Sequence, residues 1–303
     1  MRRVRASPAG LWWTRDSRHR EFRTSWASRA FILWFDMPAL RSITLGLLLT
    51  AFAAGNALAT KREEAHKGPP PHPVVLELFT SQGCSDCPAA DRLVTQLANR
   101  GDIIALSLPI TYWDILGWKD TFATDANTRR QKSYARTMNR SGIYTPQMIV
   151  DGRLDVLGNQ RDHVMSALAL RANALAHEIS VPLLLRKISN RIEIAIPKMK
   201  GGDKNPATIW VMRVLGQGSV KIGDGENANR QLTYTNVVRD LQRAGEWNGQ
   251  AMKIDLPVKI AKLNYDGVVV ILQAQDYGPV LGAAALRLSE APMALPAEIL
   301  TKF

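Results

Sequence analysis

The chain has 303 residues, of which 46% are hydrophobic and 22% charged, with 21 Gly and 16 Pro. This composition is ordinary for a globular protein and excludes a mostly disordered chain, a coiled coil and a collagen-like fibre. The formal net charge is +12, from 39 basic and 27 acidic residues. Residues 1–36 hold eight Arg against three acidic residues and so carry +5 of it. Because charge alone is weak support for nucleic-acid binding, no nucleic-acid partner is expected.

Residues 37–59 have the three parts of a secretory signal peptide. Arg41 gives a basic start, an apolar run of 12 residues extends from Ile43 to Ala54, and Ala57-Leu58-Ala59 has the small-x-small pattern of a cleavage site. A membrane anchor is the alternative, but a spanning helix needs about 20 apolar residues. We therefore expect cleavage, a periplasmic or secreted protein, and no stable membrane anchor afterwards.

Residues 1–59 are not expected to be part of the fold, and a linker follows them. Residues 1–36 are rich in Arg and Trp without a clear period. They are interpreted as an extension upstream of a true start at Met37, with a long basic beginning of the signal peptide as the alternative. Residues 60–73 are polar and then proline-rich, which favours an extended linker.

The only two cysteines, Cys84 and Cys87, lie in one Cys-Ser-Asp-Cys motif. Zinc takes four ligands and no second pair completes a tetrahedron, so no metal is expected. Export places the pair where disulfides persist, yet a disulfide across two intervening residues closes a tiny loop and restrains few unfolded conformations. A redox pair is the better interpretation if the pair lies between a strand and a helix.

The neighbouring sequence has that pattern. Residues 74–80 form a near-continuous apolar run, typical of a strand covered on both faces. Pro88 suits the first turn of a helix, with Asp91 on its polar side, and a second strand is expected at 103–108. The helix N-terminus favours a thiolate at Cys84, predicted to be the exposed attacking thiol, with Cys87 as the shielded resolving one.

Further elements follow in chain order. An aromatic loop contains Trp113 and Trp118, and helices are expected at 124–138 and 160–176, with a strand at 147–152 between them. From residue 179 the period changes to alternation, which predicts a hairpin and then regular short strands of a β-sandwich-like region.

The segment from Phe79 to Pro88 resembles the signature of an exported bacterial family, domain of unknown function 1223. The resemblance continues through Tyr144-Thr145-Pro146-Gln147 and Gly225-Glu226-Asn227, and covers residues 74–288. It implies an α/β thioredoxin-like domain at 74–177, and the alternating period predicts that a mostly β, sandwich-like C-terminal domain follows at 178–303. It also implies that Pro146 is cis beside the redox pair, with Thr145 free to pair with a substrate.

Supporting roles are assigned with their alternatives. Glu77, in the first strand, is a candidate proton relay for Cys87, or else a simple ion-pair partner. Trp113 and Trp118 are candidates for a substrate-binding wall with Thr145 and Pro146, or else a local hydrophobic cluster.

These observations predict a thiol–disulfide oxidoreductase with catalytic Cys84, Cys87 and Glu77, and no cofactor. Its partners would be a protein or small-molecule thiol or disulfide substrate and an unidentified redox partner. The alternatives are a non-catalytic binding or structural module with a stable disulfide, and copper handling by the two thiolates, which no neighbouring Met or His pair supports.

Overall fold

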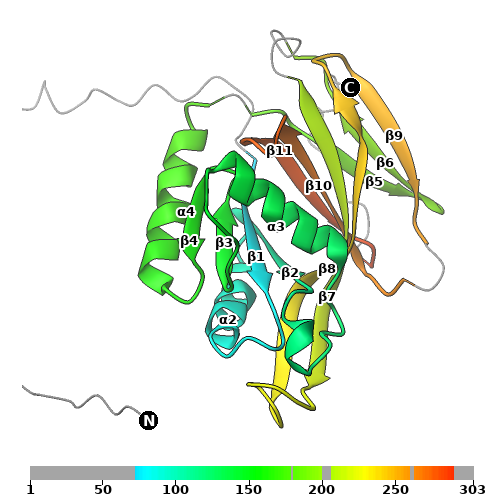
Figure 1. Cartoon of the computed structure of the whole chain (residues 1–303). Helices are drawn as coiled ribbons and strands as arrows, with labels where there is room; N and C mark the ends of the chain where they lie inside the picture. The colour runs from blue at the N-terminus through cyan, green and yellow to red at the C-terminus, as the bar shows by residue number, and fades with distance from the viewer. Residues whose placement is uncertain (1–71, 179, 200–205, 260–262, 290–303) are drawn as a thin grey trace, which may run out of the picture. The chain divides into compact units, whose positions relative to one another are not determined.

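The computed structural model describes residues 72–178, 180–199, 206–259 and 263–289. The N-terminal extension, the signal peptide and nearly all of the linker therefore lie outside the described residues. The described chain is mostly β, with three α-helices, an eight-stranded sheet and a three-stranded sheet (Figure 1).

The first part of the chain forms the elements that carry the cysteines. Strand β1 (Val74–Thr80) is buried along its whole length, as its apolar run predicted. Helix α2 (Cys87–Leu97) begins with Pro in its first turn, where the missing N–H leaves no bond unmade. Strand β2 (Ile103–Pro109) pairs in parallel with β1.

The remaining elements follow the predicted order with shifted bounds. After β2, the chain forms in order the short 3-10 helix η1 (Asp114–Leu116), α3 (Asp125–Thr137), β3 (Gln147–Val150), β4 (Leu154–Leu157) and α4 (Arg161–Leu175). The later part contains β5 (Leu184–Ile188), β6 (Arg191–Ile196), β7 (Ala207–Lys221), β8 (Gln231–Trp247), β9 (Met252–Pro257), β10 (Gly267–Ala274) and β11 (Val280–Arg287). The predicted hairpin is confirmed as the antiparallel pair β5–β6.

The predicted fold class, an α/β thioredoxin-like domain followed by a separate sandwich-like domain, is wrong. One mixed sheet has the strand order β11-β10-β7-β8-β2-β1-β3-β4, so strands from both halves of the chain share it. The two halves join where Ser107 of β2 pairs in parallel with Val237 of β8. The physical reason is strand length: β7 and β8 have 15 and 17 residues, long enough to continue alongside β2.

The hydrophobic core follows this joined sheet. On one face, α2 and α4 cover Leu76 and Leu78 of β1. On the other face, Val75 and Phe79 pack with Tyr134 of α3 and with β7, β8 and β10 in a single cluster. A third cluster lies between the two sheets, where β6 of the smaller sheet packs against β7 and β10 of the larger one. A core shared between early and late strands is a second reason why the thioredoxin-like and sandwich-like parts do not stand as separate layers.

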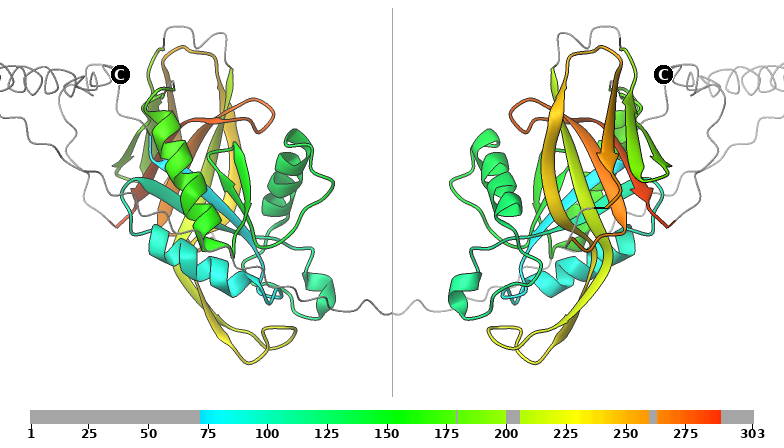
Figure 2. Two further views of the ribbon diagram at one scale, coloured as in Figure 1. Left: turned by 90° about the vertical axis from the view of Figure 1, so that its left-hand side faces the viewer. Right: turned by 90° about the vertical axis from the view of Figure 1, so that its right-hand side faces the viewer.

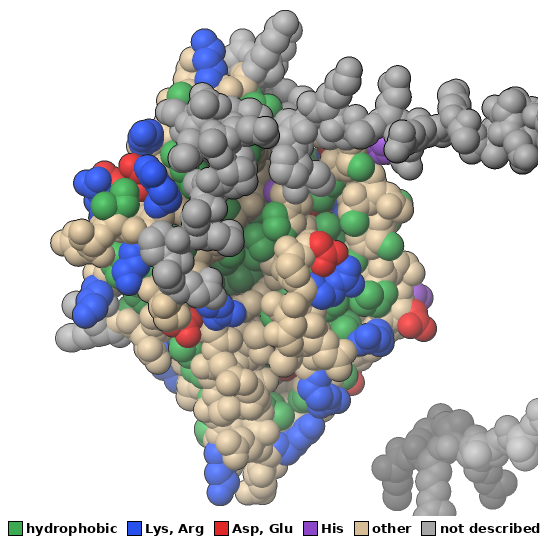
Figure 3. All heavy atoms as spheres, turned by 180° about the vertical axis from the view of Figure 1, so that it is seen from behind, with side chains coloured by type: hydrophobic (Ala, Val, Ile, Leu, Met, Phe, Trp, Pro, Cys, Tyr) green, Lys and Arg blue, Asp and Glu red, His purple; other side chains and the backbone are tan. Residues whose placement is uncertain are grey.

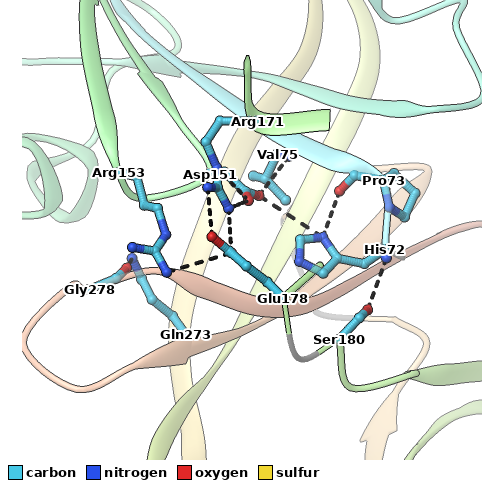
Figure 4. A network of polar contacts seen from close by, with 10 residues as sticks. All are labelled: His72, Pro73, Val75, Asp151, Arg153, Arg171, Glu178, Ser180, Gln273 and Gly278. Carbon is cyan, nitrogen blue, oxygen red and sulfur yellow. Dashed lines mark hydrogen bonds and ion pairs between the residues drawn. The ribbon is translucent and has the colours of Figure 1, made fainter. Parts of the chain in front are cut away.

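A buried polar network joins the start of the described chain to its later part (Figure 4). Asp151, at the β3–β4 turn, accepts a hydrogen bond from Arg171 of α4 at 2.9 Å, and Arg171 also contacts Glu178 at 2.8 Å. The backbone N–H of His72 donates to the Ser180 hydroxyl at 3.0 Å. The network therefore holds residue 72 against the segment that follows α4.

The face seen from behind has a hollow lined by apolar side chains (Figure 3). Between β2, β7, β10 and β11, a small cavity of about 170 Å³ is lined mainly by aliphatic residues such as Ile104, Val214 and Val268. No helix in the described ranges is long and apolar enough to cross a membrane.

Candidate functional site

The two cysteines form a disulfide at the start of α2. Cys84 and Cys87 are bonded, with their Cα atoms 5.4 Å apart. The turn before the helix is held by backbone hydrogen bonds from the N–H of Cys84 to the Ser81 carbonyl and from the N–H of Cys87 to the Cys84 carbonyl, both 3.3 Å. The pair thus lies between a central parallel strand and its helix, as the motif predicted.

The predicted exposure of Cys84 is wrong. Cys84 is 1% exposed and Cys87 0%, while Ser85 and Asp86 between them are exposed. The helix start alone would leave the first sulfur open, so another part of the chain must cover it. The burial means that in this conformation neither sulfur can be reached by a reagent or substrate.

The tip of the β7–β8 hairpin lies against the disulfide turn, and it projects at the end of the molecule where η1 and the start of α2 lie (Figure 2). Asn227 at this tip is fully buried, and its Nδ2 donates to the carbonyl oxygens of Gln82 at 3.0 Å and Cys84 at 2.8 Å. The Glu226 carboxylate accepts the N–H of Ser85 at 2.9 Å. The tip therefore binds the backbone of the disulfide turn from outside.

The aromatic loop supports both the tip and the turn. Trp118 donates its ring N–H to Gln82 Oε1 at 2.8 Å, and its ring packs so close to Gly223 that a Cβ there would lie 2.6 Å from the ring. Only glycine lets the hairpin approach this closely. The loop is thus a clamp between hairpin tip and disulfide turn, which is nearer to the local-cluster interpretation than to an open substrate wall.

Trp113 links the turn to the predicted Thr-Pro segment. Its ring N–H donates to Thr145 Oγ1 at 2.8 Å, and its side chain lies against Gly83. The Thr145–Pro146 bond is cis, which confirms that prediction, and Pro146 is buried. The structure thus gathers Cys84, Cys87, Trp113, Trp118, Thr145 and Pro146 around one turn.

Glu77 does not join this group. Because side chains alternate along a strand, Glu77 shares a face with Val75 and Phe79, which pack toward α3, whereas Leu76 and Leu78 face α2. The Glu77 carboxylate is buried and pairs with Arg130 through Nε at 2.5 Å and Nη2 at 3.0 Å. The tyrosine hydroxyl of Tyr134 donates to the same carboxylate at 2.5 Å. Of the two roles weighed for Glu77, the geometry matches the ion pair.

The buried acid on the disulfide's side is Asp91. It lies four residues after Cys87 in α2, so both side chains project from the same helix face. Asp91 is 4% exposed, which corrects its predicted place on the polar side. One carboxylate oxygen accepts the Thr80 hydroxyl at 2.9 Å, and the other is buried with no hydrogen-bond partner among the described residues.

Burial raises the pKa of Asp91 to about 8, an effect that the Thr80 hydrogen bond opposes and the negative charge of Asp120 strengthens. Asp120 is also buried, and burial raises its pKa to about 6 against three backbone N–H donors. One of those donors is the N–H of Gln82, at 2.8 Å. Two acids with raised pKa values thus lie beside the disulfide turn.

Sequence reasoning missed Asp91, Asp120 and Asn227 as members of the site. Asp91 interrupts an apolar face of α2, whose only other charged residue, Arg92, is exposed, and this position was the available signal. For Asn227 the signal was its place in a short Gly-Glu-Asn pattern. Among the described residues, no group of three or more His, Cys, Asp or Glu side chains is arranged to hold a metal ion.

Comparison with known proteins confirms the resemblance to this family. The chain matches the family described as "Protein of unknown function (DUF1223)" over residues 75–273. An X-ray crystal structure of a protein from Agrobacterium tumefaciens is similar, with 30% identity, a TM-score of 0.64, and coverage of 76% of this chain and 100% of that chain. The protein HBP35 of Porphyromonas gingivalis aligns with 12% identity and a TM-score of 0.48, over 76% of this chain and 82% of that one. No curated protein matches.

Proposed function

The chain belongs to the DUF1223 family of proteins of unknown function, and from this premise we propose that it exchanges thiols and disulfides through Cys84 and Cys87 under control of the β7–β8 hairpin tip. The observation that carries this proposal is the environment of Asp91. A buried carboxyl with a pKa of about 8, one oxygen of which has no partner among the described residues, is costly to keep in a fold, and a disulfide used only as a staple would not require it.

In the direction that starts from the disulfide present here, a substrate thiolate attacks Cys84 Sγ. The Cys84–Cys87 bond breaks, a mixed disulfide forms, and Cys87 leaves as a thiolate. Asp91, protonated at neutral pH because its pKa is about 8, gives Cys87 a proton. A second substrate thiolate then attacks the mixed disulfide and releases Cys84, so the substrate is oxidised to its disulfide and the protein pair is reduced.

The first step requires the hairpin tip to open. The hydrogen bonds of Asn227 and Glu226 to the turn must break before Cys84 Sγ can be approached along its bond axis. Local opening of a loop held by a few hydrogen bonds is within the range that folded proteins undergo. Exchange should therefore be slow in the closed state and controlled by this opening.

The same proposal includes export to the periplasm or the medium. Its support is the signal-like segment at residues 37–59, and a disulfide would persist in that compartment. The partners would be a thiol or disulfide substrate and a separate redox partner. N-terminal sequencing of the protein recovered from the exporting cell tests the export: a chain that keeps residues 37–59 would contradict it.

A binding or structural module with a stable disulfide is the second candidate, and the burial of both sulfurs favours it. The deciding experiment uses a Cys87→Ala variant expressed in the exporting cell. If exchange occurs, Cys84 forms mixed disulfides with particular partners, which a Cys84→Ala/Cys87→Ala variant does not form. Absence of any trapped partner, with a wild-type disulfide that resists a small dithiol under native conditions, would leave only the stable module.

A further inference from the structure

A basic hollow lies between α3 and the strands β7 and β8, on the sheet face away from the disulfide helix. We call it the α3 hollow, and its volume is about 390 Å³. Trp210 of β7 and Tyr277 of the β10–β11 turn form an aromatic wall, their ring centroids 5.4 Å apart. A hollow of this size with aromatic and a few polar groups is typical of a small-molecule site.

Its charge is of one sign. Arg129, Lys132 and Arg136 are exposed on α3 and line the hollow, and no acidic side chain lines it in the described part of the chain. Arg130 also lines it, but its charge is matched by Glu77. Three cations around a partly apolar hollow attract an anion and hold it more firmly than the same cations on a flat surface would.

Arg130 supplies the independent observation that points to a ligand. Its guanidinium carbon lies 5.2 Å from the centroid of the Trp210 ring and 5.6 Å from that of Tyr277. Its Nε and Nη2 donate to described acceptors, whereas Nη1 is buried with no acceptor among the described residues. A buried guanidinium donor without an acceptor is unfavourable, and a small outward shift of the Arg130 side chain would let an anionic oxygen in the hollow satisfy it.

We propose that the α3 hollow binds a small aromatic carboxylate. The carboxylate would meet Arg129 and Arg136 and, after a small outward shift of its side chain, Arg130 Nη1, and the ring would stack on Trp210 and Tyr277. Arginine suits a carboxylate because its planar donors match two oxygens at once. This proposal does not depend on chemistry at the disulfide.

The test is calorimetric titration of the full chain with 1-naphthoate, with the uncharged 1-naphthalenemethanol and inorganic phosphate in parallel. We expect saturable one-to-one binding of 1-naphthoate that weakens with added salt. The alcohol and phosphate should each bind about tenfold more weakly or worse, because each offers only one half of the recognition.

The variants assign the binding to the hollow. Arg129→Ala/Arg136→Ala should weaken naphthoate binding about tenfold, and Trp210→Leu should weaken it as well. Arg92→Ala/Arg100→Ala, with one residue in α2 and one just after it, removes the same charge from exposed positions elsewhere and should leave binding unchanged. Because Arg129 and Arg136 are exposed and not in the core, the Arg129→Ala/Arg136→Ala variant keeps the test valid if Trp210→Leu fails to fold. No saturable binding, equal binding of the alcohol, equal binding of phosphate, or equal loss in the Arg92→Ala/Arg100→Ala variant would each overturn the proposal.

Discussion

Asn227 Nδ2 lies 2.8 Å from the carbonyl oxygen of Cys84, although 143 residues separate the two in the chain. The same nitrogen also contacts the Gln82 carbonyl, so one buried side chain closes the β7–β8 hairpin over the disulfide turn. The Arg230 guanidinium donates to Asn227 Oδ1 at 2.6 Å and so fixes which end of the amide faces the turn.

Asn227→Ala should therefore open the disulfide to reagents. Removing the amide leaves two carbonyls without their donor, which should lower the free energy of unfolding by about 1–3 kcal/mol. If opening limits exchange, the rate of reduction by dithiothreitol should rise about tenfold for each 1.4 kcal/mol lost from the closed state. Samples are quenched at intervals with excess iodoacetamide, and mass spectrometry then counts the alkylated cysteines. Lys221→Ala, exposed on the same hairpin, is the control, and equal rates in wild type and Asn227→Ala would show that the tip does not gate the sulfurs.

Glu77→Gln should damage stability and leave exchange alone. The variant leaves Arg130 buried without its counter-charge, which costs about 3–5 kcal/mol when a buried pair is broken. Urea denaturation measures the loss. Glu77→Leu/Arg130→Met removes both charges together and should be more stable than Glu77→Gln. A slower disulfide exchange in Glu77→Gln, measured where the variant is still folded, would restore Glu77 as a relay.

Local pattern predicted local structure well. The apolar run at 74–80 became β1, and Pro88 lies in the first turn of α2, because strand burial and helix starts are decided by neighbouring residues. The Cys pair and the cis Thr145–Pro146 bond were likewise found from short motifs, the latter through family resemblance.

Long-range contacts decided what the sequence did not reveal. Cys84 was expected to be exposed because nothing near it in sequence covers it, whereas Asn227 reaches it from the other half of the chain. Asp91 looked like part of a polar helix face until Thr80 and Asp120 were placed around it. The joined sheet follows from the pairing of Ser107 with Val237, which no periodicity within either strand encodes.

Reducing the disulfide should cost little stability if its role is exchange. A loop of about four residues restrains the unfolded chain by only about 2 kcal/mol in the chain-entropy model. We expect the reduced protein to stay folded, with a free energy of unfolding, measured in urea, that is lower by no more than that amount, and with a near-native circular dichroism spectrum. A Cys84→Ser/Cys87→Ser variant, compared with the oxidised wild type, controls for the reductant. Unfolding on reduction would instead support the stable structural disulfide.

Asp91→Asn should change how stability depends on pH. In the folded protein, burial raises the pKa of Asp91 from its ordinary value of 3.8 to about 8. Between about pH 4 and pH 8 the folded state therefore holds a proton that the unfolded state has lost. Stability should fall as pH rises through this window, by up to about 1.4 kcal/mol per pH unit. The neutral amide of Asn has no such titration, so the stability of the variant should fall less.

The range between about pH 6 and pH 8 isolates the titration of Asp91. Burial raises the pKa of Asp120 to about 6, so Asp120 changes the stability of wild type and Asp91→Asn mainly below pH 6. Urea denaturation at half-unit pH steps measures the difference, with the exposed Asp86→Asn as the matched control. If Asp91 also protonates Cys87, Asp91→Asn should slow thiol release below pH 8, where the acid is protonated, and converge on wild type above it. Parallel stability curves for Asp91→Asn and wild type from pH 6 to pH 8 would contradict the raised pKa. An unchanged exchange rate with a changed stability curve would leave Asp91 a buried acid with no part in the proton transfer.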